Sequence, residues 1–401
     1  GWQPDNRVYV VCSNLTVAAG GTINADVAGY TGGGLIINQW RRGYGPGGGF
    51  GGPRGGGGGN GGNGGSGQDE TAGPACGSLG FPQDPGSGGG GGYNAIGGTN
   101  AGPGGGAVRI DAGGVVAVYG TITANGGTAG SYGGGGSGGS ILIQCRRFDG
   151  DTNGLIRANG ADGRCPADGG PINGGGGAGG RIAILYDTAA QTTNPRVRLA
   201  AAPGPSWGVP AEPGTLYLPN ALFLSGALTD RLFWPLRVFF NGLTNWDLDS
   251  LTVRDCALTF LNEPLLVTVT NAVVVDAGGS LGLSPGATLR GGALTLINGG
   301  TLSMRSAATN WAGTNCGGLM EVAGDVAIGS NSWLYPASHP TNGGSVLLRM
   351  SNLVVAAAGG ISANGLGYRG GGLLTNVNPR STYGWGPSGG TCGNARGGGG
   401  G

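Results

Sequence analysis

The sequence contains no lysine and a single histidine, and these absences narrow the chemistry that the chain can carry. A phosphate-binding loop of the Walker type needs its lysine, so none is present. His339 alone cannot supply a zinc site built from several histidines, and it argues against Ser-His-Asp catalysis. We therefore predict that the protein is not an enzyme, with no cofactor, no metal and no catalytic residue.

Charge and long apolar runs are also scarce. Charged residues are 10% of the chain and the formal net charge is +1, whereas soluble domains carry about 25% charged residues. This balance offers no electrostatic basis for binding nucleic acid. No run approaches the roughly 20 apolar residues of a membrane span, and no signal-peptide pattern opens the sequence. We predict no membrane insertion and expect mature or internal sequence: either a segment of a longer, polymer-like protein or a chain whose end joins an equivalent neighbour.

Seven cysteines are widely spaced, and no two of them form a C-x-x-C pair. This spacing disfavours a zinc ribbon or a thioredoxin-like motif. Two interpretations remain open: disulfides formed in an oxidising compartment, or small buried thiols. The cysteines are Cys12, Cys76, Cys145, Cys165, Cys256, Cys316 and Cys392.

Glycine is what the chain has in abundance, at 100 of 401 residues. In the stretch from Gly49 to Gly67 every third residue is glycine, which matches the three residues per turn of polyproline II. An edge of glycines lets another backbone approach closely, although glycine runs can also be flexible linkers. We predict threefold-helical excursions that pack side by side, over residues 41–106, 126–139, 160–180 and 366–401.

A long repeat organises the sequence. SNLTVAAGGTINADVAGYTGGGL, residues 13–35, returns as SNLVVAAAGGISANGLGYRGGGL, residues 351–373, at an offset of 338 without a gap. A shorter motif of alternating apolar strands, closed by φ-x-Ala-Asn or Asp, recurs between the copies. Strands separated by glycine turns favour the stacked coils of a β-solenoid. The predicted fold is all-β: parallel β-solenoid coils interleaved with a bundle of polyglycine or polyproline II-like excursions, and almost no helix.

Three regions follow from this pattern. Residues 1–202 form a glycine-rich solenoid, and residues 339–401 begin the second copy of the repeat. Residues 203–338 form a glycine-poor β-rich region, in which 203–248 are either further coils or a small β-sandwich. Separate strands are expected there at 232–234, 266–270 and 272–275. In the solenoid, Asp26, Asn125, Asn159 and Asn364 would form a turn ladder, or each would cap its own turn.

Aromatic residues among the glycines and arginines are the candidate contact residues. They could stack on sugars or on neighbouring subunits, or pack within the glycine bundle. Asp247 and Asp249 alternate along a predicted strand, as the carboxylates of a polysaccharide-cleaving β-helix do, or they are solvated turn residues. The aromatic candidates are Trp40, Tyr44, Phe50, Tyr93, Tyr132, Tyr368, Tyr383 and Trp385.

GGGGSGGSILI, GGGGAGGRIAILY, EPGTLYL, LDSLTVRD and the I-x-A-N-G turns together resemble the glycine-rich repeat proteins predicted on bacterial cell surfaces. The glycine tracts also look like the polyglycine II bundles of phage adhesin tips and of arthropod antifreeze proteins. The resemblance implies a secreted or surface β-solenoid and transfers no functional residue. We predict an extracellular structural protein that assembles with itself into a filament, sheath or fibre. The alternatives are an adhesin that binds polysaccharide, a β-helix polysaccharide-degrading enzyme and, more remotely, an ice-binding protein.

Overall fold

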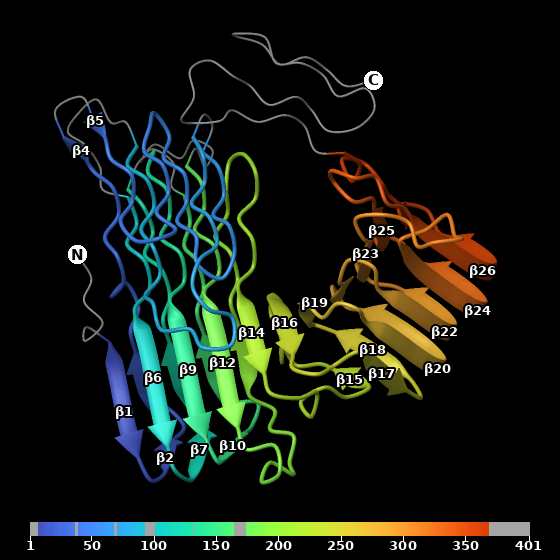
Figure 1. The fold of residues 1–401 in the computed structure, drawn as a ribbon, viewed down its shortest axis with the longest axis horizontal. Coiled ribbons are helices and arrows are strands. Elements are labelled where there is room, and N and C mark those ends of the chain that lie inside the picture. The colour runs from blue at the N-terminus through green and yellow to red at the C-terminus, as the bar shows by residue number, and fades with distance from the viewer. Residues whose placement is uncertain are drawn as a thin grey trace. The chain divides into compact units, whose positions relative to one another are not determined.

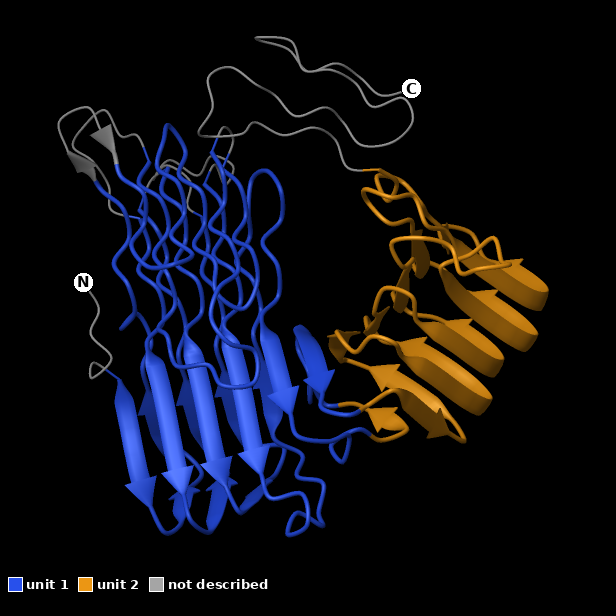
Figure 2. Cartoon of the chain, viewed as in Figure 1, with its two compact units in different colours: residues 1–224, 230–242 blue, residues 225–229, 243–401 orange. Residues whose placement is uncertain are grey.

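The structure is a computed structural model that describes residues 7–36, 39–67, 70–92, 101–130, 132–163 and 174–368. These residues form strands, turns and irregular segments, and no helix is present among them (Figure 1). The all-β class predicted from the sequence is therefore confirmed, with several parallel sheets. The chain divides into two compact units, residues 1–224 with 230–242, and residues 225–229 with 243–401 (Figure 2).

Short strands of the first unit recur in groups, each group passing through the same sheets in turn. We call residues 8–24 the first group, 107–123 the second and 140–157 the third. Their strands are β1 (Val8–Cys12), β2 (Leu15–Val17) and β3 (Thr22–Asn24), then β6 (Ala107–Ala112), β7 (Val115–Val118) and β8 (Thr121–Thr123), then β9 (Ser140–Cys145), β10 (Arg147–Gly150) and β11 (Leu155–Arg157). The strands that follow are β12 (Arg181–Tyr186), β13 (Arg198–Ala200), β14 (Thr215–Leu218) and β16 (Leu236–Phe240).

Corresponding strands of successive groups pair in parallel. The sheets run β1-β6-β9-β12-β14-β16, β2-β7-β10 and β3-β8-β11-β13. A separate antiparallel pair joins β4 (Leu35–Ile36) to β5 (Gln39–Trp40). Because the parallel pairs are in register, equivalent apolar residues stack into columns. One fully buried column is Val108, Ile141, Ile182, Leu216 and Val238.

This stacking explains why β-branched residues dominate the strands, since they pack well on a pleated surface. Each such side chain contributes about 1.5–3 kcal/mol when it is fully buried. The core of the first unit is therefore a set of parallel apolar columns, and each new strand group extends every column by one residue.

The second unit follows the same principle with longer strands. One sheet runs β19-β21-β23-β25-β27, and the other runs β15-β18-β20-β22-β24-β26, with β17 also paired to β20. Leu258, Leu281, Leu302, Leu334 and Ile361 stack in one column. The strands are β15 (Ala227–Leu228), β17 (Asn245–Leu248), β18 (Leu251–Arg254), β19 (Ala257–Phe260), β20 (Leu266–Asp276), β21 (Ser280–Leu283), β22 (Thr288–Leu296), β23 (Thr301–Arg305), β24 (Gly318–Ile328), β25 (Trp333–Ala337), β26 (Val346–Val355) and β27 (Gly360–Ile361).

Two strand predictions in the glycine-poor region need correction. The strand expected at 232–234 is reduced to a single parallel bridge between Leu199 and Phe233. The two strands expected at 266–270 and 272–275 are one strand, β20, whose pairing with β22 shifts register between Val269 and Ala272. Alternation is interrupted at this shift, which is why the sequence reads as two strands. Residues 203–248 contribute β14 and β16, which continue a parallel sheet of the first unit. The predicted boundaries at 202 and 338 stay predictions.

Between the strand groups of the first unit, the chain leaves the sheets and returns through glycine-rich segments without regular strand structure (Figure 1). Within the described residues, these segments include 55–62, 85–92, 133–139 and 174–180, in which every residue is buried. Because nearly all of these buried residues are glycine, backbone packs against backbone.

Candidate functional site

Backbone N–H groups of the glycine-rich segments donate in three directions that repeat every third residue. In residues 134–139 the acceptors are carbonyl oxygens of three different segments, at 2.7–3.0 Å. Toward segment 85–92, the N–H groups of Gly134 and Ser137 donate to the carbonyls of Gly90 and Ser87. Toward segment 174–180, those of Gly135 and Gly138 donate to Gly175 and Ala178. Toward residues 124–127, those of Gly136 and Gly139 donate to Gly127 and Ala124.

Segment 174–180 repeats the arrangement. Its N–H groups also donate in three directions, and here one acceptor is a side chain. Toward residues 55–58, the N–H groups of Gly175 and Ala178 donate to the carbonyls of Gly55 and Gly58. Toward residues 158–161, those of Gly177 and Gly180 donate to Ala161 and Ala158. Toward residues 206–212, Gly176 donates to Ser206 Oγ and Gly179 to the Glu212 carbonyl. The donor direction thus repeats every three residues along both segments.

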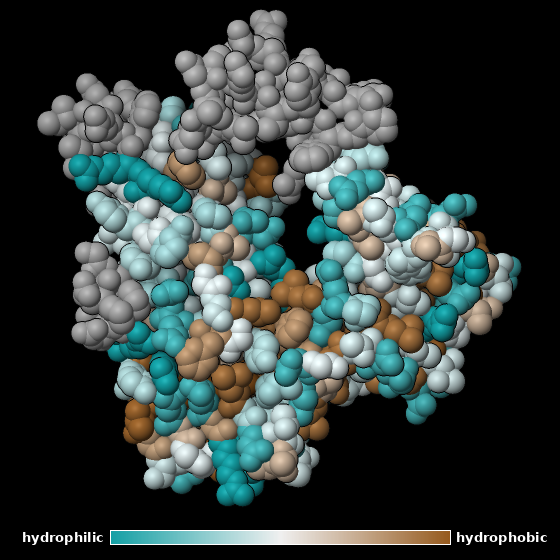
Figure 3. Space-filling model, in the orientation of Figure 1, coloured by the Kyte–Doolittle hydropathy of each residue, from teal (hydrophilic) through white to brown (hydrophobic). Residues whose placement is uncertain are grey.

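Glycine is required here by the closeness of neighbouring backbones. A Cβ on Gly134 would overlap the carbonyl oxygen of Gly56, and a Cβ on Gly175 would overlap that of Gly65. Real Cβ atoms do not make such contacts, so any side chain would force the segments apart. Hydrophilic, intermediate and hydrophobic residues are interspersed over the face of the molecule that Figure 3 draws.

A few buried polar side chains are admitted to the glycine segments and are bonded there. Asn60 Nδ2 donates to the Gly138 carbonyl at 2.7 Å. Ser137 Oγ accepts from the Ser87 N–H at 2.8 Å and donates to the Ser87 carbonyl at 3.2 Å. These side chains tie segments together at the positions where the neighbouring backbone leaves room for them.

Three of the predicted turn residues bond one another where the strand groups end. The N–H and Nδ2 of Asn125 donate to Asp26 Oδ1 at 2.7 and 2.9 Å. The Asn159 N–H donates to Asn125 Oδ1 at 2.9 Å, and Asn159 Oδ1 accepts from the Ala202 N–H at 2.9 Å. Asn364 lies in the second unit, is exposed, and does not join this series; its N–H contacts Ser362 Oγ at 3.4 Å.

Side-chain surroundings are described for four of the predicted aromatic residues. Tyr44 and Tyr368 are 49% and 44% exposed. The Phe50 ring is half-buried and packs under the Arg42 guanidinium, whose Cζ lies 4.5 Å from the ring centroid. Tyr132 is half-buried at a turn, and its carbonyl accepts from the Gly55 N–H.

The remaining aromatic candidates are less informative. Trp40 ends β5. Tyr93, Tyr383 and Trp385 lie outside the described residues.

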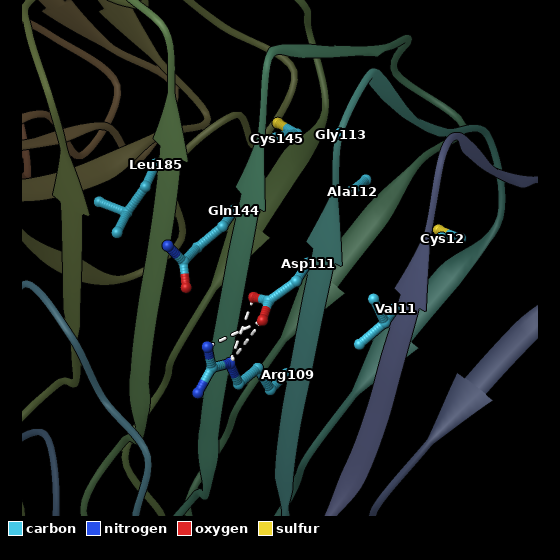
Figure 4. A pocket seen from close by; sticks show the side chains of 9 residues that line it. All are labelled: Val11, Cys12, Arg109, Asp111, Ala112, Gly113, Gln144, Cys145 and Leu185. Atoms are coloured by element: carbon cyan, nitrogen blue, oxygen red, sulfur yellow. Dashed lines mark hydrogen bonds and ion pairs between the residues drawn. The ribbon is translucent and has the colours of Figure 1, made fainter.

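A groove on the outer face of sheet β1-β6-β9-β12 was not predicted (Figure 4). Arg109 forms an ion pair with Asp111 at 2.8 Å and lies over the Tyr9 ring at 4.8 Å. The Tyr9 hydroxyl donates to Asp111 at 2.7 Å, and this bond raises the pKa of Tyr9. Gln144 also lines the groove, and its Oε1 is buried without a hydrogen-bond partner. The available signal was Arg109-x-Asp111 on one strand face, opposite Tyr9.

Two further groups, one of them in the groove, have pKa values shifted by their surroundings. The pKa of Asp276 is lowered, first by the Asn298 amide and then by Arg254. Burial raises the pKa of the Cys145 thiol to about 12. Four cysteines within the described ranges, Cys12, Cys76, Cys145 and Cys316, are free thiols. The Sγ of the buried Cys256 donates to the Thr229 carbonyl at 3.5 Å.

Asp247 and Asp249, the candidate carboxylates, are both exposed. Among the described residues, no cluster of three or more histidine, cysteine or acidic side chains could hold a metal ion. Over the same ranges, no helix has the length and apolar character to cross a membrane. The features that can bind a partner are therefore the backbone N–H and C=O groups of the glycine segments and the groove lined by Arg109, Asp111 and Gln144.

Comparison with known proteins returns no match to any family model, any curated protein or any solved structure.

Proposed function

We propose that this chain is a structural protein: a repeat segment of an extracellular filament, sheath or surface fibre that assembles with copies of itself. The observation that carries the proposal is the three-directional backbone bonding of the glycine segments. A segment that bonds outward in three directions is satisfied only when it is surrounded by others, so such segments favour extended packing over isolated chains.

In this interpretation the parallel sheets are coils of a β-solenoid, and the glycine segments are excursions that form a polyglycine II bundle. Energetics favour the combination. Ordering the backbone costs about 1–2 kcal/mol per residue, and a backbone hydrogen bond returns a net of about 1 kcal/mol. Glycine buries no side chain to make up the difference, so the bundle needs the apolar columns of the sheets as its anchor.

Electron microscopy of the purified chain tests this proposal. Filaments or ordered bundles with a regular long-axis repeat are expected, at a length that grows with protein concentration. Monodisperse single chains at high concentration would contradict it.

A second candidate function is attachment to polysaccharide, and the groove beside Tyr9 favours it. Tyr9 is 52% exposed, and sugar rings stack on tyrosine faces while their hydroxyls bond to carboxylate, guanidinium and amide groups. Asp111, Arg109 and the unpartnered Gln144 Oε1 supply those groups.

A glycan array probed with the full chain and with Tyr9→Ala tests the attachment function. Binding that is lost in Tyr9→Ala and kept in a Tyr44→Ala control supports the groove. Binding to no glycan rejects this second function and leaves the structural proposal untouched.

A further inference from the structure

The two copies of the repeat share backbone features, although they belong to different units. We call residues 346–361 the last group; at the offset of 338 they correspond to residues 8–23 of the first group. Both copies have left-handed backbone at the same two places: Gly20 and Ala358 have φ of 79° and 61°, and Val27 and Gly365 have φ of 61° and 67°. The copies therefore share these two turn positions as well as their sequence, although residues 346–355 form the single strand β26 where residues 8–17 form β1 and β2.

Each copy shows a different neighbour. The first group pairs with the second group, with Val10 opposite Ile110 and Ile23 opposite Ile122. Asn14 Oδ1 accepts from the Val115 N–H of that neighbour at 2.8 Å. The first group thus shows what lies on one side of this kind of coil.

The last group shows what lies on the other side. It pairs with β24 and β25, with Val326 opposite Leu353 and Leu334 opposite Ile361. Asn352, the equivalent of Asn14, donates through Nδ2 to Asp325 Oδ1 at 2.8 Å. One asparagine position therefore bonds forward in one copy and backward in the other.

Among the described residues, each copy lacks the neighbour that the other has. In the first group, β1, β2 and β3 are edge strands, and Val11 is 70% exposed. In the last group no residue of β26 is buried, and Leu353 and Val355 are 44% and 45% exposed. Each copy therefore leaves open the side that its counterpart covers.

We propose that copies of this chain join head to tail by exchange of the duplicated coil: the first group of one copy takes the place of the last group in another. It then pairs with β24 and β25 of that copy in the register Leu319 opposite Tyr9, Val326 opposite Leu15 and Leu334 opposite Ile23. This register is the observed one shifted by 338 residues. The inference rests on the proposed self-assembly and names its contact surface.

The exchange replaces like with like. Ser13, Asn14 and Leu15 stand where Ser351, Asn352 and Leu353 stand, so the bonds from Ser351 to the Ala323 carbonyl and from Asn352 to Asp325 can be reformed. Asn14 then bonds to both neighbours at once, through Oδ1 to Val115 and through Nδ2 to Asp325. The exposed Tyr9 and Val11 gain a neighbouring strand, because β1 ceases to be an edge.

Photo-cross-linking of the full chain tests the exchange. Tyr9 is replaced by p-benzoylphenylalanine, and in a control chain the 45% exposed Trp207 is replaced instead. Illumination of assembled material is expected to link position 9 of one copy to residues 318–322 of another. The Trp207 control is expected to give no such link.

A reversible lock supplies the second arm. Leu319 and Leu347 lie opposite one another on neighbouring parallel strands. Such strands are about 4.8 Å apart, and this spacing falls in the range of Cα–Cα distances that a disulfide spans. In the probe-bearing chain with Leu319→Cys and Leu347→Cys, oxidation is expected to hold the last group in place and abolish the cross-link, and reduction to restore it.

The outcomes distinguish failure of the exchange from failure of the proposed self-assembly. Assembled material whose position-9 cross-links map elsewhere, or persist in the oxidised lock, overturns the exchange and leaves self-assembly standing. Material that stays monomeric under all conditions overturns both.

Discussion

Replacing Gly134 by alanine gives opposite results for a packed glycine bundle and for flexible glycine loops. Three segments meet at this residue: the Gly134 N–H donates to the Gly90 carbonyl at 2.9 Å, and the Gly90 N–H donates to the Gly56 carbonyl at 2.8 Å. The new Cβ would overlap that same Gly56 oxygen. The substitution therefore presses on the junction of three backbones.

The size of the effect follows from these contacts. Overpacking costs about 1–3 kcal/mol, and weakening the two hydrogen bonds costs about 1 kcal/mol each, against a gain of about 0.4–1 kcal/mol from a less flexible unfolded chain. We expect Gly134→Ala to lower the free energy of unfolding by about 2–4 kcal/mol. In a flexible loop only the gain from the less flexible unfolded chain would remain. The sign of the change in the free energy of unfolding therefore distinguishes a packed bundle from a flexible loop.

Urea unfolding followed by tryptophan fluorescence measures this difference. The matched control is Gly113→Ala, because a Cβ on Gly113 meets nothing within 4 Å. The control is expected to be neutral or slightly stabilising. A Gly134→Ala protein that is as stable as the Gly113→Ala protein would refute the close packing of the segments.

Three further predictions concern individual side chains. Asn125→Ala removes a donor and an acceptor of the turn series and should destabilise the chain by about 1–3 kcal/mol. The control, Asn153→Ala at an exposed position, should change stability little. The urea midpoints of the two variants measure the difference. Because Asn298 lowers the folded pKa of Asp276, the stabilisation is present above the unfolded pKa and is lost as pH falls through the folded one. Melting temperatures between pH 7 and pH 2 should show a smaller acid loss in Asp276→Asn; an unchanged acid loss would contradict this. With a pKa of about 12, about one Cys145 thiol in ten thousand is ionised at pH 8, so iodoacetamide should modify Cys145 far more slowly in the native chain than in urea, as peptide mass spectrometry would show.

The sequence predicts the strands of this fold well because strand groups repeat a pattern that side chains define. Ile122, Ile156 and the residues that follow them mark equivalent turns, and this is why Asn125 and Asn159 could be paired in advance. Ala202 could not be foreseen as the next member, because its backbone N–H rather than a side chain completes the series.

Which glycine segments neighbour each other was beyond prediction for a physical reason. Segment 132–139 bonds to segment 85–92 rather than to some other tract, yet nothing in a run of glycines encodes that choice. The choice is made by where the strand groups release each segment, and by rare side chains such as Asn60. The groove beside Tyr9 could not be predicted for another reason: Tyr9 and Arg109 lie together only because of the register in which β1 pairs with β6.

Amide hydrogen exchange of the glycine segments tests the central claim most directly. If Gly134, Gly135, Gly136 and their equivalents in segment 174–180 each donate to a neighbouring segment, their amides should exchange as slowly as those of β9 and β12 in the sheet. Exchange at the rate of an unstructured peptide would contradict the three-directional bundle and, with it, the structural role proposed for this chain.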